Sequence, residues 1–257
     1  MEDIKIFDSH AHYDDEQFDE DRDQIIEEIK NSNVIGVLNC GSSFYGAQKS
    51  VELAEKNDFF YAAVGLHPEY ANEVDDNMIE KLKQLAKSPK VKAIGEIGLD
   101  YYYKENPPRE IQKRAFIKQM ELAEELQLPV VIHDRDAHED TLDIIKRFPK
   151  VKGVIHCFSG SLEFARLCIK LGYYIGFTGV VTFKNSKKIK EVAKEIPLER
   201  MLVETDCPYM SPEPNRGKRN KSNYIKFIIE KLAEIKSVQP SVISEKTCEN
   251  IKDLLRL

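Results

Sequence analysis

The sequence predicts a single (β/α)8 TIM-type barrel, an α/β fold with its candidate metal site at the C-terminal ends of the strands. Eight short apolar runs alternate with helix-length amphipathic segments along the 257 residues, as parallel strands do when helices join them. Eight such units in a chain of about 250 residues favour a closed barrel over an open doubly wound sheet. No linker rich in proline, serine and glycine divides the chain, so we expect one domain over residues 1–257.

The expected strands are runs of apolar, often β-branched residues bounded by polar or turn-forming residues. They cover residues 4–7, 34–39, 59–65, 91–97, 129–133, 153–157, 173–177 and 201–205. Amphipathic segments with polar starts and closing lysine or glycine are expected to form helices between them. These include residues 21–30, 78–86, 108–126, 137–146, 162–170 and 186–196. A pair of carboxy-terminal helices from Ser222 and Ser241 is expected to cover the outside of the barrel.

The composition indicates a globular protein of a reducing compartment. Hydrophobic residues make up 42% of the chain, enough for a sizeable core. The five cysteines are scattered and form no Cys-x-x-Cys pair, so we expect no disulfide framework, no zinc ribbon and a cytoplasmic location. No signal sequence precedes Asp8 and no run approaches the ~20 apolar residues of a membrane span. We therefore expect neither export nor membrane insertion.

The net charge of −6 bears on possible partners. It argues against a general nucleic-acid coat, although a local basic patch or bound cations can still receive a phosphate backbone. No feature of the sequence indicates a particular oligomeric state.

A His-x-His pair follows the first expected strand. If that strand continues to His10 and His12, the period-2 alternation of side chains points both imidazoles to the same side, where they can converge on one cation. A pair of this kind is also found as plain solvated residues, so the question is whether other strand ends supply matching ligands.

Four more strand ends carry potential metal ligands. These potential ligands are Glu96, His133, His156 and Asp206. In a barrel the active site is built at the carboxyl ends of the strands, and four of the six histidines fall there. Four imidazoles and two carboxylates exceed what one tetrahedral zinc needs and suit two divalent cations ~3.5–4 Å apart. Zinc, manganese and magnesium all accept such a mixed set.

Alternation within the strands supports the same ring of side chains. Each ligand is expected to project inward on the face of the residue two positions before it. The pairs are Ile94 with Glu96, Val131 with His133, Val154 with His156, and Glu204 with Asp206, and Thr205 is expected to point outward.

These motifs together resemble the TatD family of metal-dependent deoxyribonucleases, within the amidohydrolase-like barrel superfamily. The matching stretches are Asp8-Ser9-His10-Ala11-His12, Gly65-Leu66-His67-Pro68, Gly95-Glu96-Ile97-Gly98-Leu99-Asp100-Tyr101, Pro129-Val130-Val131-Ile132-His133 with Arg135-Asp136-Ala137, His156-Cys157-Phe158-Ser159-Gly160 and Glu204-Thr205-Asp206-Cys207-Pro208-Tyr209, with Asn250 in the last helix. The resemblance implies metal ligation by His10, His12, Glu96, His133, His156 and Asp206. It also implies hydrolysis of nucleic-acid phosphodiesters, typically as a 3′–5′ exonuclease on DNA, with RNA as a further possible substrate.

Roles for individual residues follow from the chemistry. Glu96 is expected to bridge the two cations, and Asp206 to bind one of them and accept a proton from the attacking water. His67 is expected either to contact a phosphate or simply to cap its loop. Arg216, Lys218 and Arg219 lie in a basic run after the last strand and are expected to hold the phosphate backbone, the alternative being a solvated face.

Two other functional classes remain open at this point. A small-molecule amidohydrolase acting on an amide or ester would use the same metal ring but would not need the basic run. A noncatalytic metal-binding barrel would have no need for the complete set of six ligands.

Overall fold

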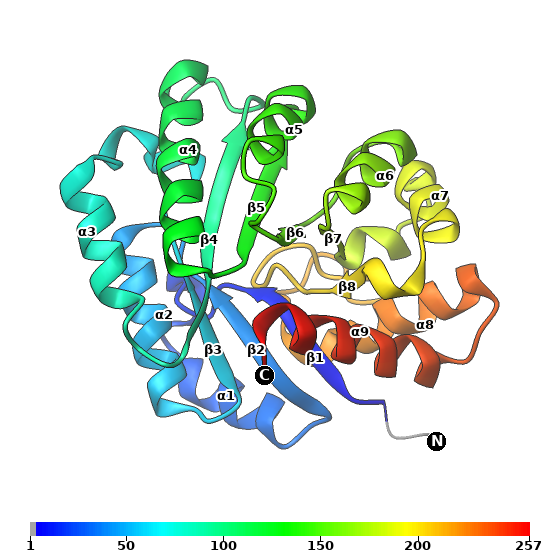
Figure 1. The fold of residues 1–257 in the computed structure, drawn as a ribbon. Helices are drawn as coiled ribbons and strands as arrows, with labels where there is room; N and C mark the ends of the chain where they lie inside the picture. The colour runs from blue at the N-terminus through cyan, green and yellow to red at the C-terminus, as the bar shows by residue number, and fades with distance from the viewer. Residues whose placement is uncertain (1–3) are drawn as a thin grey trace.

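The computed structural model describes residues 4–257, which form one sheet of eight parallel strands with helices around it (Figure 1). The strands are β1 (Ile6–Ala11), β2 (Val34–Cys40), β3 (Phe60–Val64), β4 (Val91–Asp100), β5 (Val130–Arg135), β6 (Gly153–Ile155), β7 (Tyr174–Phe177) and β8 (Met201–Val203). They pair in sequence order from β1 to β8. The predicted barrel class and all eight predicted strands are confirmed, with differences of a few residues at their ends.

Helices pack around the sheet, most of them on its outside. They are α1 (Arg22–Lys30), α2 (Phe44–Lys56), α3 (Asp76–Leu85), α4 (Arg109–Leu126), α5 (His138–Lys146), α6 (Leu162–Lys170), α7 (Lys187–Glu195), α8 (Ile225–Lys236) and, closing the chain, α9 (Pro240–Leu255). Short 3-10 turns supplement them: η1 (Glu16–Phe18), η2 (Pro68–Glu73), η3 (Gly179–Thr182), η4 (Leu198–Arg200) and η5 (Ser222–Tyr224). Among the helices within residues 4–257, none has both the length and the apolar character needed to cross a membrane.

The expectation that both carboxy-terminal helices cover the outside of the barrel is wrong for the second one. Helix α8 packs outside, beside α7 and η3. Helix α9 instead closes the amino end of the barrel, where its apolar residues join the side chains that fill the interior. Those helix residues are Cys248, Ile251, Leu254 and Leu255, and the interior residues are Phe7, Leu38, Ala63, Ala93, Val131, Val154 and Leu202. Burial of this apolar surface stabilises the closed end.

A few backbone bonds and a buried carboxylate close the seam between β1 and β8. The amide of Asp206 donates to the His10 carbonyl at 2.9 Å, and the amide of His12 donates to the Cys207 carbonyl at 2.8 Å. The buried Asp8 carboxylate accepts from the Thr205 amide at 2.9 Å and from its hydroxyl at 2.6 Å. The Ser222 hydroxyl of η5, outside the strands, bonds the same carboxylate at 2.7 Å, so Thr205 points away from the barrel interior, as expected.

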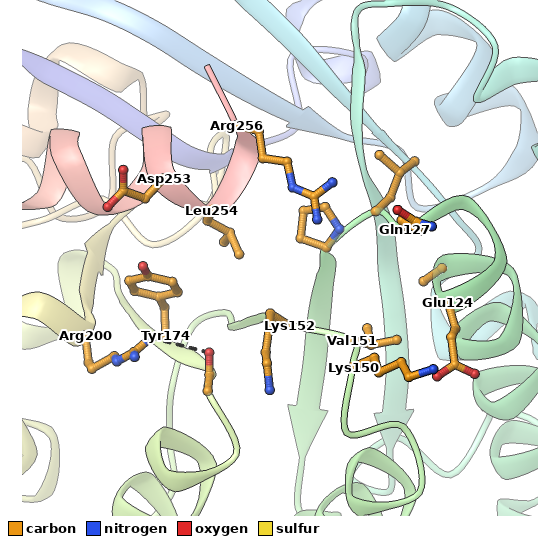
Figure 2. A pocket seen from close by; sticks show the side chains of 14 residues that line it. Glu124, Gln127, Lys150, Val151, Lys152, Tyr174, Arg200, Asp253, Leu254 and Arg256 are labelled. Atoms are coloured by element: carbon orange, nitrogen blue, oxygen red, sulfur yellow. Dashed lines mark hydrogen bonds between the residues drawn. The ribbon is translucent and has the colours of Figure 1, made fainter.

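A hollow of about 600 Å3 lies at the amino end of the barrel (Figure 2). Arg256 and Leu254 at the end of α9 form one wall, and Tyr174 with Lys152 forms another. Its lining contains no histidine, and none of the predicted ligands lies there. The predicted site residues are all at the opposite, carboxyl end of the strands.

Candidate metal centre

The predicted ligands meet in a hollow of about 280 Å3 at the carboxyl end of the barrel. Its lining comprises His12, Asp14, Asp15, Ser42, His67, Glu69, Glu96, His133, His156, Asp206 and Tyr209. His10 lies beneath the hollow and is fully buried. The prediction that six side chains from β1, β4, β5, β6 and the end of β8 converge is therefore matched by their positions.

Four ligand atoms form a first group around one point. His10 Nε2 and His12 Nε2 are 2.9 Å apart. Glu96 Oε2 lies 3.4 Å and 3.6 Å from these two nitrogens, and Asp206 Oδ1 lies 3.5 Å and 3.4 Å from them. Two ligand atoms about 2.0–2.2 Å from a shared ion, at a tetrahedral angle, lie roughly 3.3–3.6 Å apart. The four separations between imidazole nitrogens and carboxylate oxygens fit a single divalent cation, whereas the two imidazole nitrogens lie closer together than this range.

The other oxygen of Glu96 belongs to a second group. Glu96 Oε1 is 2.9 Å from His133 Nδ1 and 2.7 Å from His156 Nε2. These two nitrogens are 3.2 Å apart. Each oxygen of this one carboxylate therefore faces a different set of imidazoles, an arrangement that could hold two cations with Glu96 between them.

Glu96 reaches the interior by a route that differs from the expected alternation. Ala93 lies among the interior residues, whereas Ile94 packs in the outer core between strand and helices. The pairing of β4 with β5 shifts register between Ile94 and Ile97. Because one step of register moves a side chain to the other face, this irregularity turns Glu96 inward, and the predicted pairing of Glu96 with Ile94 is wrong.

Hydrogen bonds behind the ligands orient two of the imidazoles. His12 Nδ1 bonds the Cys40 carbonyl at 2.7 Å, which places the proton on Nδ1 and leaves Nε2 free for a cation. His133 Nε2 lies 3.1 Å from Asp100 Oδ2, which places the proton on Nε2 and leaves Nδ1 free. The sequence reasoning gave Asp100 no role, although it lies an even number of residues beyond Glu96 on the same strand, a spacing that points both side chains to one face.

The carboxylates of the centre stay ionised despite their burial. Burial by itself would raise the pKa of Glu96, but the charges of His156 and His10 outweigh it and hold that pKa well below its usual range. Burial also raises the pKa of Asp206, but the hydrogen bond to His12 and the nearby imidazoles outweigh it, so that pKa is lowered. Burial lowers the pKa of His12, yet Asp206 and Glu96 raise it on balance to about 9. The field at this point therefore favours positive charge, as a cation site requires.

His67 lies at the rim of the same hollow. Its ring is 4.4 Å from the ring of His133, and its Nδ1 accepts a hydrogen bond from the Glu69 amide at 3.3 Å. Burial and the neighbouring His133 lower the pKa of His67 to about 3, so it is a neutral imidazole at ordinary pH. Its position thus combines the two expected roles, because it caps η2 with one nitrogen and lines the hollow with the rest of its ring.

The basic run after β8 has more structural partners than expected. Arg219 pairs with Asp21 at 2.5 Å and lies over the Phe18 ring at 4.8 Å. Arg216 lies over the Phe183 ring at 4.3 Å, and Lys218 reaches only Asn215, at 3.5 Å. None of the three basic residues lines the hollow that holds the ligands. Arg219 therefore anchors its loop to η1 and the start of α1.

Comparisons with known proteins agree with this geometry. Residues 7–256 match the family model described as TatD related DNase. The metal-dependent hydrolase YabD of Bacillus subtilis, named as uncharacterised, is 44% identical over 98% of this chain and 99% of its own. The 3′–5′ ssDNA/RNA exonuclease TatD of Erwinia billingiae is 34% identical over 98% of this chain and 99% of its own. The crystal structure of YjjV, a TatD homologue from Escherichia coli, superposes with a TM-score of 0.92 at 29% identity, covering 99% of both chains.

Proposed function

The chain belongs to the TatD-related DNase family of metal-dependent hydrolases, and from this we propose that it hydrolyses nucleic-acid phosphodiester bonds as a 3′–5′ exonuclease on DNA. The observation that carries the proposal is the Glu96 carboxylate, whose two oxygens face separate groups of imidazoles. RNA is proposed as a second substrate, because the Erwinia relative is named as an exonuclease of both ssDNA and RNA.

Two divalent cations are proposed to occupy the two groups. His10, His12, Glu96 and Asp206 would hold one, and Glu96, His133 and His156 the other. Zinc, manganese and magnesium are all compatible with these nitrogen and oxygen ligands. When bound, such ions supply Lewis acidity toward a phosphoryl oxygen and make water a stronger nucleophile.

Asp206 is the proposed proton acceptor for the attacking water. Its carboxylate is ionised, and the side chain is 14% exposed at the floor of the hollow, so it can reach both solvent and ligands. The bond from its amide to the His10 carbonyl holds its backbone in place. A carboxylate in this position can take a proton from water within hydrogen-bond reach.

The neighbours of the centre are proposed to orient the reacting groups. Asp100 and the Cys40 carbonyl hold two imidazoles with the correct nitrogen toward the centre. His67, as a neutral imidazole, can donate a hydrogen bond to a phosphate oxygen at the rim. For the phosphate backbone of a longer strand, Arg216 and Lys218 are the members of the basic run that have no carboxylate within ion-pair distance among residues 4–257.

The test is digestion of end-labelled oligonucleotides by protein that has been stripped with a chelator and reloaded with one metal at a time. Labelled single-stranded DNA, RNA and a chromogenic diester serve as substrates, with an amide and a lactone as controls. We expect processive shortening from the 3′ end that requires added metal. Metal-dependent hydrolysis of only the amide or the lactone would assign the chain to the small-molecule amidohydrolases instead.

A variant of the bridge links this activity to the centre. Glu96→Gln keeps the shape but removes the charge that both groups share, so we expect loss of bound metal and a fall in turnover of roughly 10²-fold or more. The matched control is Glu121→Gln, which makes the same charge change at an exposed position of α4, outside both groups. Equal metal content in Glu96→Gln and the unaltered chain would contradict the bridging role.

A further inference from the structure

Two hollows meet at the candidate metal centre and share three of its ligands. The larger, of about 280 Å3, and a smaller one of about 120 Å3 are both lined by His133, His156 and Asp206. A strand that places a phosphodiester over the centre therefore has one hollow on each side of the bond to be cleaved.

The larger hollow has an acidic wall without compensating cations. Asp14, Asp15 and Glu69 line it, and within residues 4–257 no lysine or arginine forms an ion pair with any of these carboxylates. Lys49 comes nearest, but it bonds the Asp14 carbonyl and the Asp19 carboxylate. No lysine or arginine within residues 4–257 therefore pairs directly with the carboxylates of this wall.

Asp15 is held toward this hollow by neutral donors. Its Oδ2 accepts the Tyr209 hydroxyl at 2.8 Å, and its Oδ1 accepts the Gln17 amide at 2.8 Å. Tyr209 also lines the hollow. The carboxylate is held in a defined position, and each oxygen retains a lone pair for a further donor.

The smaller hollow has the opposite character. Tyr103 and Arg135 line it, and the Arg135 guanidinium lies over the ring of Tyr102 at 4.7 Å. Tyr102 and Tyr103 are 53% and 58% exposed, unusual values for large aromatic side chains. Of the three carboxylates on this side, Asp100 and Asp134 are each bonded to a histidine, and Asp206 lies beside His10 and His12 in the first ligand group. A cation beside exposed aromatic rings suits phosphates and stacked bases of a single strand.

From this asymmetry we propose that the larger hollow receives the terminal nucleoside of the strand and that its acidic wall excludes a terminal phosphate, while the smaller hollow receives the continuing strand. This inference rests on the proposed nuclease function and adds the reason for end selectivity. A free 3′-hydroxyl can donate a hydrogen bond to Asp15 or Glu69. A 3′-phosphate, or a strand that continues past the site, brings like charge against these carboxylates and is repelled.

The test compares single-stranded oligonucleotides that end in a 3′-hydroxyl or a 3′-phosphate, each labelled at the 5′ end. For the unaltered, metal-loaded chain we expect roughly tenfold or greater preference for the hydroxyl end. Asp15→Asn/Glu69→Gln retains the hydrogen-bond acceptors and removes the charge, so this preference should shrink severalfold. The matched control Glu52→Gln/Glu121→Gln makes the same charge change on the outer faces of α2 and α4 and should leave the preference unchanged.

A binding measurement without turnover gives a second readout. Fluorescence anisotropy in chelator, with trinucleotides bearing either end, should show the same preference and the same loss in Asp15→Asn/Glu69→Gln. Equal cleavage and equal binding of the two ends, or an unchanged preference in that variant, would overturn the inference but leave the nuclease function intact. Absence of cleavage at either end would overturn the proposed function, and this inference with it.

Discussion

Replacement of Asp100 by asparagine tests how the centre controls its imidazoles. Asp100 Oδ2 accepts the proton of His133 Nε2 at 3.1 Å, and Oδ1 accepts the amides of Tyr102 and Tyr103 at 2.9 Å and 3.2 Å. In Asp100→Asn the side-chain carbonyl can keep the two amide bonds, which leaves its NH2 group facing His133. Two donors then meet, so His133 is driven to the tautomer with its proton on Nδ1, the nitrogen that faces Glu96.

The magnitude follows from the loss of this orienting bond. Removal of a carboxylate behind a ligating histidine typically costs 10–100-fold in metal affinity or activity, which corresponds to about 1.4–2.7 kcal/mol. Metal affinity should fall at the group formed by Glu96, His133 and His156. It should stay unchanged at the group that contains His10 and His12. Metal titration of the stripped protein should therefore show one site weakened and one site retained.

A neighbouring variant provides the control for this prediction. Asp134→Asn alters a carboxylate of the same strand that bonds His138, outside both ligand groups. We expect its metal content and the affinity of both sites to match those of the unaltered chain. If Asp100→Asn binds two ions with unchanged affinity and turns over at the original rate, the reasoning about the His133 tautomer is refuted.

Three further predictions concern stability and substrate binding. Saturating metal should raise the melting temperature by roughly 5–10 °C, because binding at about 100 times the Kd adds about 2.7 kcal/mol to the folded state; scanning calorimetry with and without chelator checks this. Lys218→Ala should raise KM for oligonucleotides and flatten its dependence on salt, whereas Arg219→Ala should chiefly lower the melting temperature. Asn250→Ala should destabilise by about 2–3 kcal/mol in urea, because the Leu198 and Met201 carbonyls lose their buried donor, while metal content stays constant.

The eight strands were predictable because parallel strands buried on both faces read as short apolar runs. Their ends were harder to place, since polar ligands continue the strand without continuing the apolar pattern. β4 shows this best, because it runs to Asp100 although the apolar pattern predicted an end at residue 97. The residues that extend it, including Asp100, are the ones that support the metal centre.

The convergence of the six proposed ligands was predictable for a different reason, namely that histidines and carboxylates are unusual at the ends of buried strands. The way in which the Glu96 side chain comes to face the interior was not predictable. The register shift between Ile94 and Ile97 depends on pairing with β5 and leaves no trace in the apolar pattern of β4. The inward position of α9 was hidden in the same way. The apolar residues of α9 show only that one face of the helix is buried. They do not show that this face packs against the amino end of the barrel.

Arg219 shows why a charged loop cannot be assigned a ligand from its charge alone. The run from Arg216 to Lys221 appears in sequence as unpartnered positive charge at the mouth of the barrel. In the structure Asp21 and Glu28, almost two hundred residues earlier in the chain, take Arg219 and Lys221 as ion-pair partners. Within residues 4–257, Arg216, Lys218 and Arg135 form no ion pair, and the Arg135 guanidinium lies over the exposed ring of Tyr102 at 4.7 Å. Which charges of the run are used within the fold is therefore decided by partners distant in the sequence.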